Sequence, residues 1–125
     1  MDKKRIVVVD DDKEFLDEFC QLLRQSNYQV DEYATSQTLL KDLEDIMPDL
    51  IILDLELEGK SGFRLASEIR KKKRFSKIPI LAMTGFHFED NCYHRMKEFG
   101  INKYIIKDFN QYNLIAKIEE VIDEG

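Results

Sequence analysis

Four consecutive apolar residues that end on a carboxylate, Leu50 to Leu53 and then Asp54, constrain the fold of this chain more than any other stretch. A continuous branched run of this length, between Pro48-Asp49 and Glu58-Gly59, is typical of a parallel strand buried on both faces. Asp54 then lies at the carboxyl end of a strand. Open parallel sheets bind ligands at this edge, because the loops that leave the strands spread apart over a rigid floor. Asp54 is therefore the candidate reactive residue.

Further apolar runs alternate with amphipathic segments along the whole chain. The predicted strands cover residues 5–9, 28–33, 50–53, 78–83 and 103–106. Helical spacing of apolar residues predicts helices that begin after Asp12, after a cap at Thr35 or Ser36, after a cap at Ser61, near His87 and near Asn110. Short strand–helix alternation predicts an α/β fold, a doubly wound five-stranded parallel sheet of flavodoxin-like order 2-1-3-4-5 with helices on both faces. The polar alternation of residues 28–33 favours an edge strand.

Composition excludes several classes of function. The chain has 125 residues, enough for one domain, and a net charge of −6 that argues against a direct nucleic-acid partner. No apolar segment approaches the roughly 20 residues of a membrane span, so no membrane insertion and a cytoplasmic location are expected. Cys20 and Cys92 each fall in a predicted helix and are interpreted as reduced thiols.

Polar residues stand where the predicted strands end. They are Asp10-Asp11-Asp12 after the first strand, Asp54 after the third, Thr84 after the fourth and Lys107 after the fifth. Each alone has an ordinary explanation: a helix cap, a turn residue or a solvated tip. In a doubly wound sheet these strand ends meet at one edge, so the residues are expected to share one shallow pocket.

Clustered carboxylates repel each other unless a cation lies between them. An all-oxygen site without imidazole or thiolate suits Mg²⁺, which accepts a few carboxylates, water and a substrate phosphate. Lys107 adds a second positive charge, and Thr84 adds a hydroxyl donor. This set can bind a phosphoryl group on Asp54 and neutralise its developing charge, which is most of what phosphoryl transfer requires of a protein.

The order acidic cluster, Asp, Thr, Lys at the ends of the first, third, fourth and fifth strands resembles the receiver domain of two-component response regulators, and the resemblance covers residues 1–125 as a single domain. It implies a phosphoacceptor rather than an enzyme that turns over a substrate. Asp54 would accept the phosphoryl group from the phosphohistidine of a histidine kinase or phosphotransfer domain, or from a small phosphodonor. The resemblance further implies an unknown downstream protein or a separate output domain.

The resemblance also implies a role for each matching position. Asp11 would hold Mg²⁺ directly, Asp10 through water, and the backbone carbonyl of Glu56 would join Asp54 as a ligand. Lys107 would pair with the phosphoryl oxygens.

Two further positions match the switch of the family. Thr84 would turn inward to hydrogen-bond the phosphoryl group, and the ring of Tyr104 would move inward behind it. The output surface implied is the fourth helix, fifth strand and fifth helix, which is also a possible homodimer interface.

Three departures from the family pattern qualify these roles. Asp108 follows Lys107 where the family has a cis proline, and a cis bond without proline costs about 2.5–4 kcal/mol, so a trans peptide is expected. Glu58 replaces a common proline, which predicts a looser loop. Gly85 follows Thr84 where alanine is common, and the bulky Phe86 comes next. In this family the residues two beyond the Asp and the Thr, here Glu56 and Phe86, tune the phosphoryl lifetime, and the bulk of Phe86 is expected to obstruct water and lengthen that lifetime.

Three other functions compete with this interpretation. A receiver-like module that binds partners without phosphorylation is the main alternative. An aspartyl-phosphate phosphatase of the haloacid dehalogenase type would need its Asp-x-Asp on the first strand, and here Asp54-Leu55-Glu56 follows the third. A flavodoxin-like flavin binder needs a hydroxyl- and glycine-rich loop after the first strand, where Asp10-Asp11-Asp12 would repel the flavin phosphate.

Overall fold

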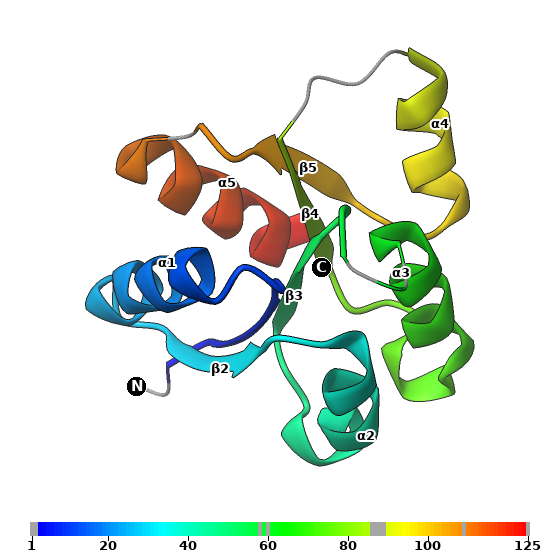
Figure 1. Cartoon of the computed structure of the whole chain (residues 1–125), viewed down its shortest axis with the longest axis horizontal. Helices are drawn as coiled ribbons and strands as arrows, with labels where there is room; N and C mark the ends of the chain where they lie inside the picture. The colour runs from blue at the N-terminus through cyan, green and yellow to red at the C-terminus, as the bar shows by residue number, and fades with distance from the viewer. Residues whose placement is uncertain (1–2, 58, 60, 86–89, 109, 125) are drawn as a thin grey trace.

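The sheet has the predicted topology. In the computed structural model, which describes residues 3–57, 59, 61–85, 90–108 and 110–124, five parallel strands lie in the order β2-β1-β3-β4-β5 (Figure 1). The strands are β1 (Arg5–Val9), β2 (Gln29–Tyr33), β3 (Leu50–Asp54), β4 (Ile80–Thr84) and β5 (Lys103–Ile106). The doubly wound α/β fold is confirmed, with β2 on an edge of the sheet as its alternation predicted.

The central strand β3 is buried along its whole length, because β1 and β4 flank it and helices cover both of its faces. The register pairs Val9 with Leu53 and Asp54 with Met83. The carboxyl ends of β1, β3 and β4 therefore finish almost level, so the residues that follow them meet at one edge.

Side-chain caps fix the starts of three helices. Asp12, Thr35 and Ser61 each accept a hydrogen bond from the backbone N–H three residues ahead. The helices described are α1 (Lys13–Gln25), α2 (Ser36–Ile46), α3 (Gly62–Lys71), α4 (Asp90–Glu98) and α5 (Gln111–Glu124), with a short 3-10 turn at Lys73–Phe75.

Two apolar cores lie on opposite faces of the sheet. Helices α1 and α5 cover one face, and α2, α3 and α4 cover the other (Figure 1). Alternate residues of each strand enter the two cores: Ile6, Val8 and Ile52 face α1 and α5, whereas Val7 and Ile51 face the other helices. No helix in the described ranges is long and apolar enough to cross a membrane.

Several predicted boundaries differ from the structure by one or two residues. Strand β2 begins at Gln29 rather than at Tyr28, β3 ends at Asp54 rather than at Leu53, and β4 ends at Thr84 rather than at Met83. The fourth strand begins at Ile80 rather than Ile78, because Pro79 has no N–H to donate and the N–H of Ile80 is bonded to the Asn102 side chain at 2.8 Å. Helix α4 is described from Asp90, whereas the prediction began near His87, which lies outside the described residues.

Candidate functional site

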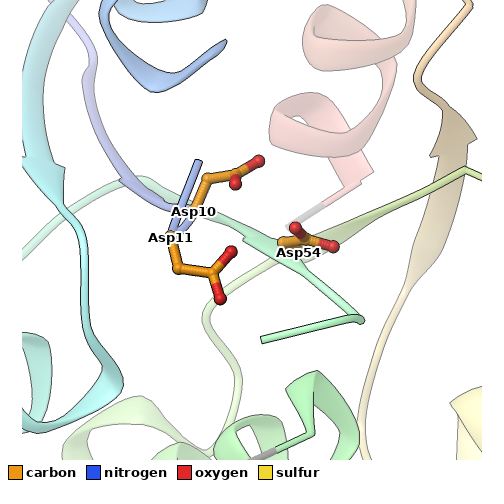
Figure 2. A group of neighbouring side chains, drawn as sticks. All are labelled: Asp10, Asp11 and Asp54. Carbon is orange, nitrogen blue, oxygen red and sulfur yellow. The ribbon is translucent and has the colours of Figure 1, made fainter. Parts of the chain in front are cut away.

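Three carboxylates gather at the carboxyl edge of the sheet. Oxygens of Asp10, Asp11 and Asp54 lie within 4.8 Å of one another, the first two from the end of β1 and the third from β3 (Figure 2). Asp10 is completely buried and Asp54 is 3% exposed, whereas Asp11 is accessible to solvent. The predicted convergence of these residues is therefore found in the structure. Asp12, the third acid of the run, caps α1 instead.

Lys107 joins this cluster from the end of β5. Its Nζ lies 2.9 Å from Oδ2 of Asp10 and 3.0 Å from Oδ2 of Asp54. The backbone N–H of Lys107 donates to the carbonyl of Thr84 at 2.8 Å, which holds the turn against β4. The described residues contain no cis peptide bond, so the Lys107–Asp108 bond is trans as predicted, and the lysine still reaches the carboxylates.

Phe15 was not among the predicted site residues. In the structure the ammonium of Lys107 lies over the Phe15 ring, 4.5 Å from its centroid, and Phe15 stacks on Phe19 with centroids 5.4 Å apart. A cation held over an aromatic face is attracted by the ring quadrupole. Phe15 therefore helps to position the lysine. Its helical spacing alone indicated a core residue and carried no signal of this contact.

Burial and charge act against each other in this cluster. Burial raises the pKa of Asp10, and this effect outweighs the hydrogen bond from the Asp12 backbone N–H and the adjacent positive charge of Lys107. Burial also acts to raise the pKa of Asp54, but hydrogen bonds from Glu56 and Lys107 outweigh it and hold that pKa below its ordinary value. Burial lowers the pKa of Lys107, and the two aspartates more than reverse that effect. Asp54 and Lys107 are therefore both charged at neutral pH.

Thr84 is buried at the end of β4, as predicted, and its hydroxyl donates to Oε1 of Glu56 at 2.7 Å. The backbone N–H of Glu56 donates to Oδ1 of Asp54 at 2.9 Å. Burial, followed by the interaction with Asp54, raises the pKa of Glu56. Glu56 was predicted to supply its backbone carbonyl and to affect the phosphoryl lifetime, and its side-chain contact with Thr84 was not predicted.

Tyr104 is half-buried on β5 and packs against the core beneath α2, α3 and α4. Its register partner on β4 is Ala82, two residues before Thr84. The two predicted switch residues thus lie on adjacent strands. Phe86, which was expected to obstruct water, lies outside the described residues.

Gly62 is a second residue near the site that was not predicted. A Cβ at this position would lie 2.3 Å from the backbone carbonyl oxygen of Asp54 and 2.6 Å from Cα of Leu55. The N–H of Gly62 also donates to the carbonyl of Leu55 at 3.0 Å. Helix α3 therefore begins directly against the backbone that carries Asp54. A glycine immediately after the Ser61 cap, where most residues are tolerated, was the available signal.

The donor set fits a hard divalent cation. It consists of carboxylate oxygens, the type of ligand that Mg²⁺ prefers. Oδ2 of Asp10 is buried and, within the described part of the chain, accepts no hydrogen bond of good geometry, although the Lys107 ammonium lies beside it. Beside Asp11 the site opens into a shallow hollow of about 260 Å³, lined also by Leu57 and Gly59. An ion therefore has a solvent-accessible side from which to enter.

Residues 6–119 match the family described as the response regulator receiver domain. Among curated proteins, the phosphate regulon transcriptional regulatory protein PhoB of Pseudomonas aeruginosa is 32% identical over 119 residues, which cover 95% of this chain and 52% of that protein. The regulatory protein VanR of Enterococcus faecium is 33% identical over 115 residues, covering 92% of this chain and 48% of VanR. The chain thus spans about half the length of these relatives.

Solved structures have the same fold. A CheY-like response regulator receiver domain protein from Methanospirillum hungatei superposes with a TM-score of 0.88 at 30% identity, covering 98% of this chain and 96% of that one. The chemotaxis protein CheY4 of Vibrio cholerae superposes with a TM-score of 0.91 at 22% identity, covering 96% and 99% of the two chains. At that identity the second likeness concerns the fold alone.

Proposed function

Because this chain belongs to the response regulator receiver domain family, we propose that it is a phosphoacceptor domain in which Asp54 takes a phosphoryl group from the phosphohistidine of a histidine kinase or phosphotransfer domain. The observation that carries the proposal is the buried Asp54 carboxylate with Nζ of Lys107 at 3.0 Å and the oxygens of Asp10 and Asp11 within 4.8 Å. We propose a cytoplasmic location, where such a donor is available.

The transfer requires an ionised Asp54. Its lowered pKa supports this state at neutral pH. In the proposed step an oxygen of Asp54 attacks phosphorus, the new O–P bond forms, and the P–N bond to the donor imidazole breaks with its electron pair staying on nitrogen. The Lys107 ammonium would neutralise charge on the transferred oxygens, the main task of a protein in phosphoryl transfer. The product is an aspartyl phosphate on the domain itself, so we do not class the domain as a turnover enzyme.

We propose that Mg²⁺ is held by Asp10, Asp11, Asp54 and the backbone carbonyl of Glu56. The bound ion would supply positive charge beside the reacting oxygens. Asp10 supports this proposal because its carboxylate is fully buried while Asp11 faces solvent, which gives one anchored ligand and one ligand at the entrance.

We propose that Thr84 and Tyr104 couple phosphorylation of Asp54 to a change in the shape of the protein surface. The Thr84 hydroxyl would donate to a phosphoryl oxygen, and the half-buried Tyr104 ring on the adjacent strand would follow it inward. The surface affected would be that of α4, β5 and α5, available to a downstream protein, an output domain or a second copy of the chain.

Intact-mass measurement tests the proposal directly. The protein is incubated with acetyl phosphate and Mg²⁺, and a gain of one phosphoryl group is expected in the wild type. The gain should be absent in Asp54→Asn and absent when EDTA removes the metal. A folded wild type whose mass never rises, with acetyl phosphate or with a phosphorylated phosphotransfer domain, would favour the partner-binding module that works without phosphorylation.

A further inference from the structure

The Glu56 side chain is engaged with the switch threonine rather than with solvent alone. Oε1 of Glu56 accepts the Thr84 hydroxyl at 2.7 Å, a short distance of the kind seen when a hydroxyl donates to a carboxylate. Thr84 itself is completely buried. The two residues belong to different strand ends, since Glu56 follows β3 and Thr84 ends β4. Their contact therefore connects the loop that carries the phosphoacceptor to the switch.

A hydroxyl has one proton to donate. While the Thr84 proton is directed at Glu56, it cannot also be directed at a phosphoryl oxygen on Asp54. We infer that the Glu56 side chain is a positioning residue that holds Thr84 in the unphosphorylated arrangement, so that switching requires the Thr84–Glu56 hydrogen bond to break. This inference rests on the proposed function. It adds that the Glu56 carboxylate competes with the phosphoryl group for the proton of the Thr84 hydroxyl.

Glu56 is arranged so that its side chain can leave while its backbone stays. The backbone N–H is held by Oδ1 of Asp54 at 2.9 Å, whereas the residue as a whole is exposed. A phosphoryl group on Asp54 would add negative charge close to the Glu56 carboxylate, and like charges repel. The carboxylate can then move into water at little desolvation cost. Phosphorylation would thus release Thr84 and displace Glu56 in the same event.

The expected consequence is that wild-type Glu56 restrains activation. Hydrogen bonds to charged groups are roughly twice as strong as those between neutral groups, and water partly replaces a lost one, so we expect about a tenfold effect on switching. Replacing Glu56 by Ala should ease the movement of Thr84. Replacing it by Gln retains an Oε1 acceptor and should preserve most of the restraint, with a change of about threefold or less.

A double-mutant cycle separates the hydrogen bond from simple charge repulsion. The probe is beryllofluoride with Mg²⁺, a phosphoryl mimic, and the readout is the half-saturating concentration followed by amide NMR shifts. In Glu56→Ala this concentration should fall about tenfold. In a Thr84→Val background, where there is no hydroxyl to hold, Glu56→Ala should change it by less than about twofold. Glu14→Ala, which removes an exposed charge from α1, serves as the control for net charge.

Each result decides a different question. Equal effects of Glu56→Ala with and without the Thr84 hydroxyl, or equal effects of the Ala and Gln replacements, would overturn the inference and leave Glu56 acting through charge alone. A folded wild type that binds no beryllofluoride, or binding that persists in Asp54→Asn, would instead overturn the proposed function.

Discussion

Lys107 reaches across strand β4 to contact Asp54: its Nζ lies 3.0 Å from Oδ2 of a residue two strands away, and it bridges to Asp10 on the next strand beyond. One ammonium thus balances two buried carboxylates. It is itself 25% exposed, so the charge is largely removed from water. The stability of the sheet edge and the chemistry of the site therefore depend on the same ion pairs.

Replacing Lys107 by Met should destabilise the protein by about 2 kcal/mol at pH 7, because two buried carboxylates lose their counter-ion. Without the lysine, burial raises the pKa of Asp10 further above that of the unfolded chain. The stability that Asp10 contributes is then full at low pH and is lost as the pH rises through that raised value. Urea unfolding should show a deficit that is larger at pH 7 than at pH 4.

Lys103→Met is the matched control for this charge. Lys103 pairs with Glu120 at the surface, where solvent screens the two charges, so removing it should change stability much less. Added Mg²⁺ should also raise the melting temperature of Lys107→Met more than that of wild type, since the vacated charge is replaced by the ion. A deficit independent of pH would contradict this account.

Phe15→Leu should make the Lys107 side chain less well ordered while changing the stability of helix α1 little. Cation–π contacts contribute about 0.5–2 kcal/mol depending on burial, so phosphorylation by acetyl phosphate should slow a few-fold. The direct measurement is the upfield shift that the Phe15 ring imposes on the Lys107 ε-protons, which should disappear. Phe19→Leu is the control, because Phe19 is buried beneath Phe15 and should lose packing energy while the lysine shift persists.

Gly62→Ala tests the close approach of α3 to the phosphoacceptor. Alanine favours a helix over glycine by up to about 1 kcal/mol, but a Cβ at 2.3 Å from the carbonyl oxygen of Asp54 forces the backbone to move. The steric cost should prevail, with a net loss of about 2 kcal/mol. Thermal unfolding measures this loss. Gly85→Ala, whose Cβ would meet no atom of the described residues within 4 Å, should change stability by less than about 0.5 kcal/mol.

The residues that the sequence identified and those it missed differ in how their contacts arise. Asp10, Asp54 and Lys107 were identifiable because each stands at the end of a local apolar run, and parallel strands bring such ends together whatever the details of packing. Thr84 was placed correctly for the same reason. The register of β1, β3 and β4 then brought these positions level.

The contacts that were missed depend on side-chain direction between segments distant in the sequence. The approach of Phe15 to Lys107 follows from how α1 packs on the sheet, and the bond between Glu56 and Thr84 follows from the path of the β3–α3 loop. Neither has a spacing signal. The start of β4 was missed because the apolar pattern passes through Pro79, although a strand ladder needs an N–H.

Cys20 offers a test of burial and of pH dependence together. Burial raises the pKa of its thiol from 9.0 to about 12. At pH 8 only about one thiol in ten thousand would then be thiolate, the reactive form. In a Cys92→Ser background, native protein should therefore react with Ellman's reagent far more slowly than protein unfolded in urea. A rapid native reaction would contradict the burial of Cys20 between α1 and the sheet. The raised pKa also makes the stability of the fold depend on pH. Because the thiol pKa is higher in the folded protein than in the unfolded chain, the contribution of Cys20 to stability is full below pH 9. The stability advantage of wild type over Cys20→Ala should then shrink as the pH rises toward 12.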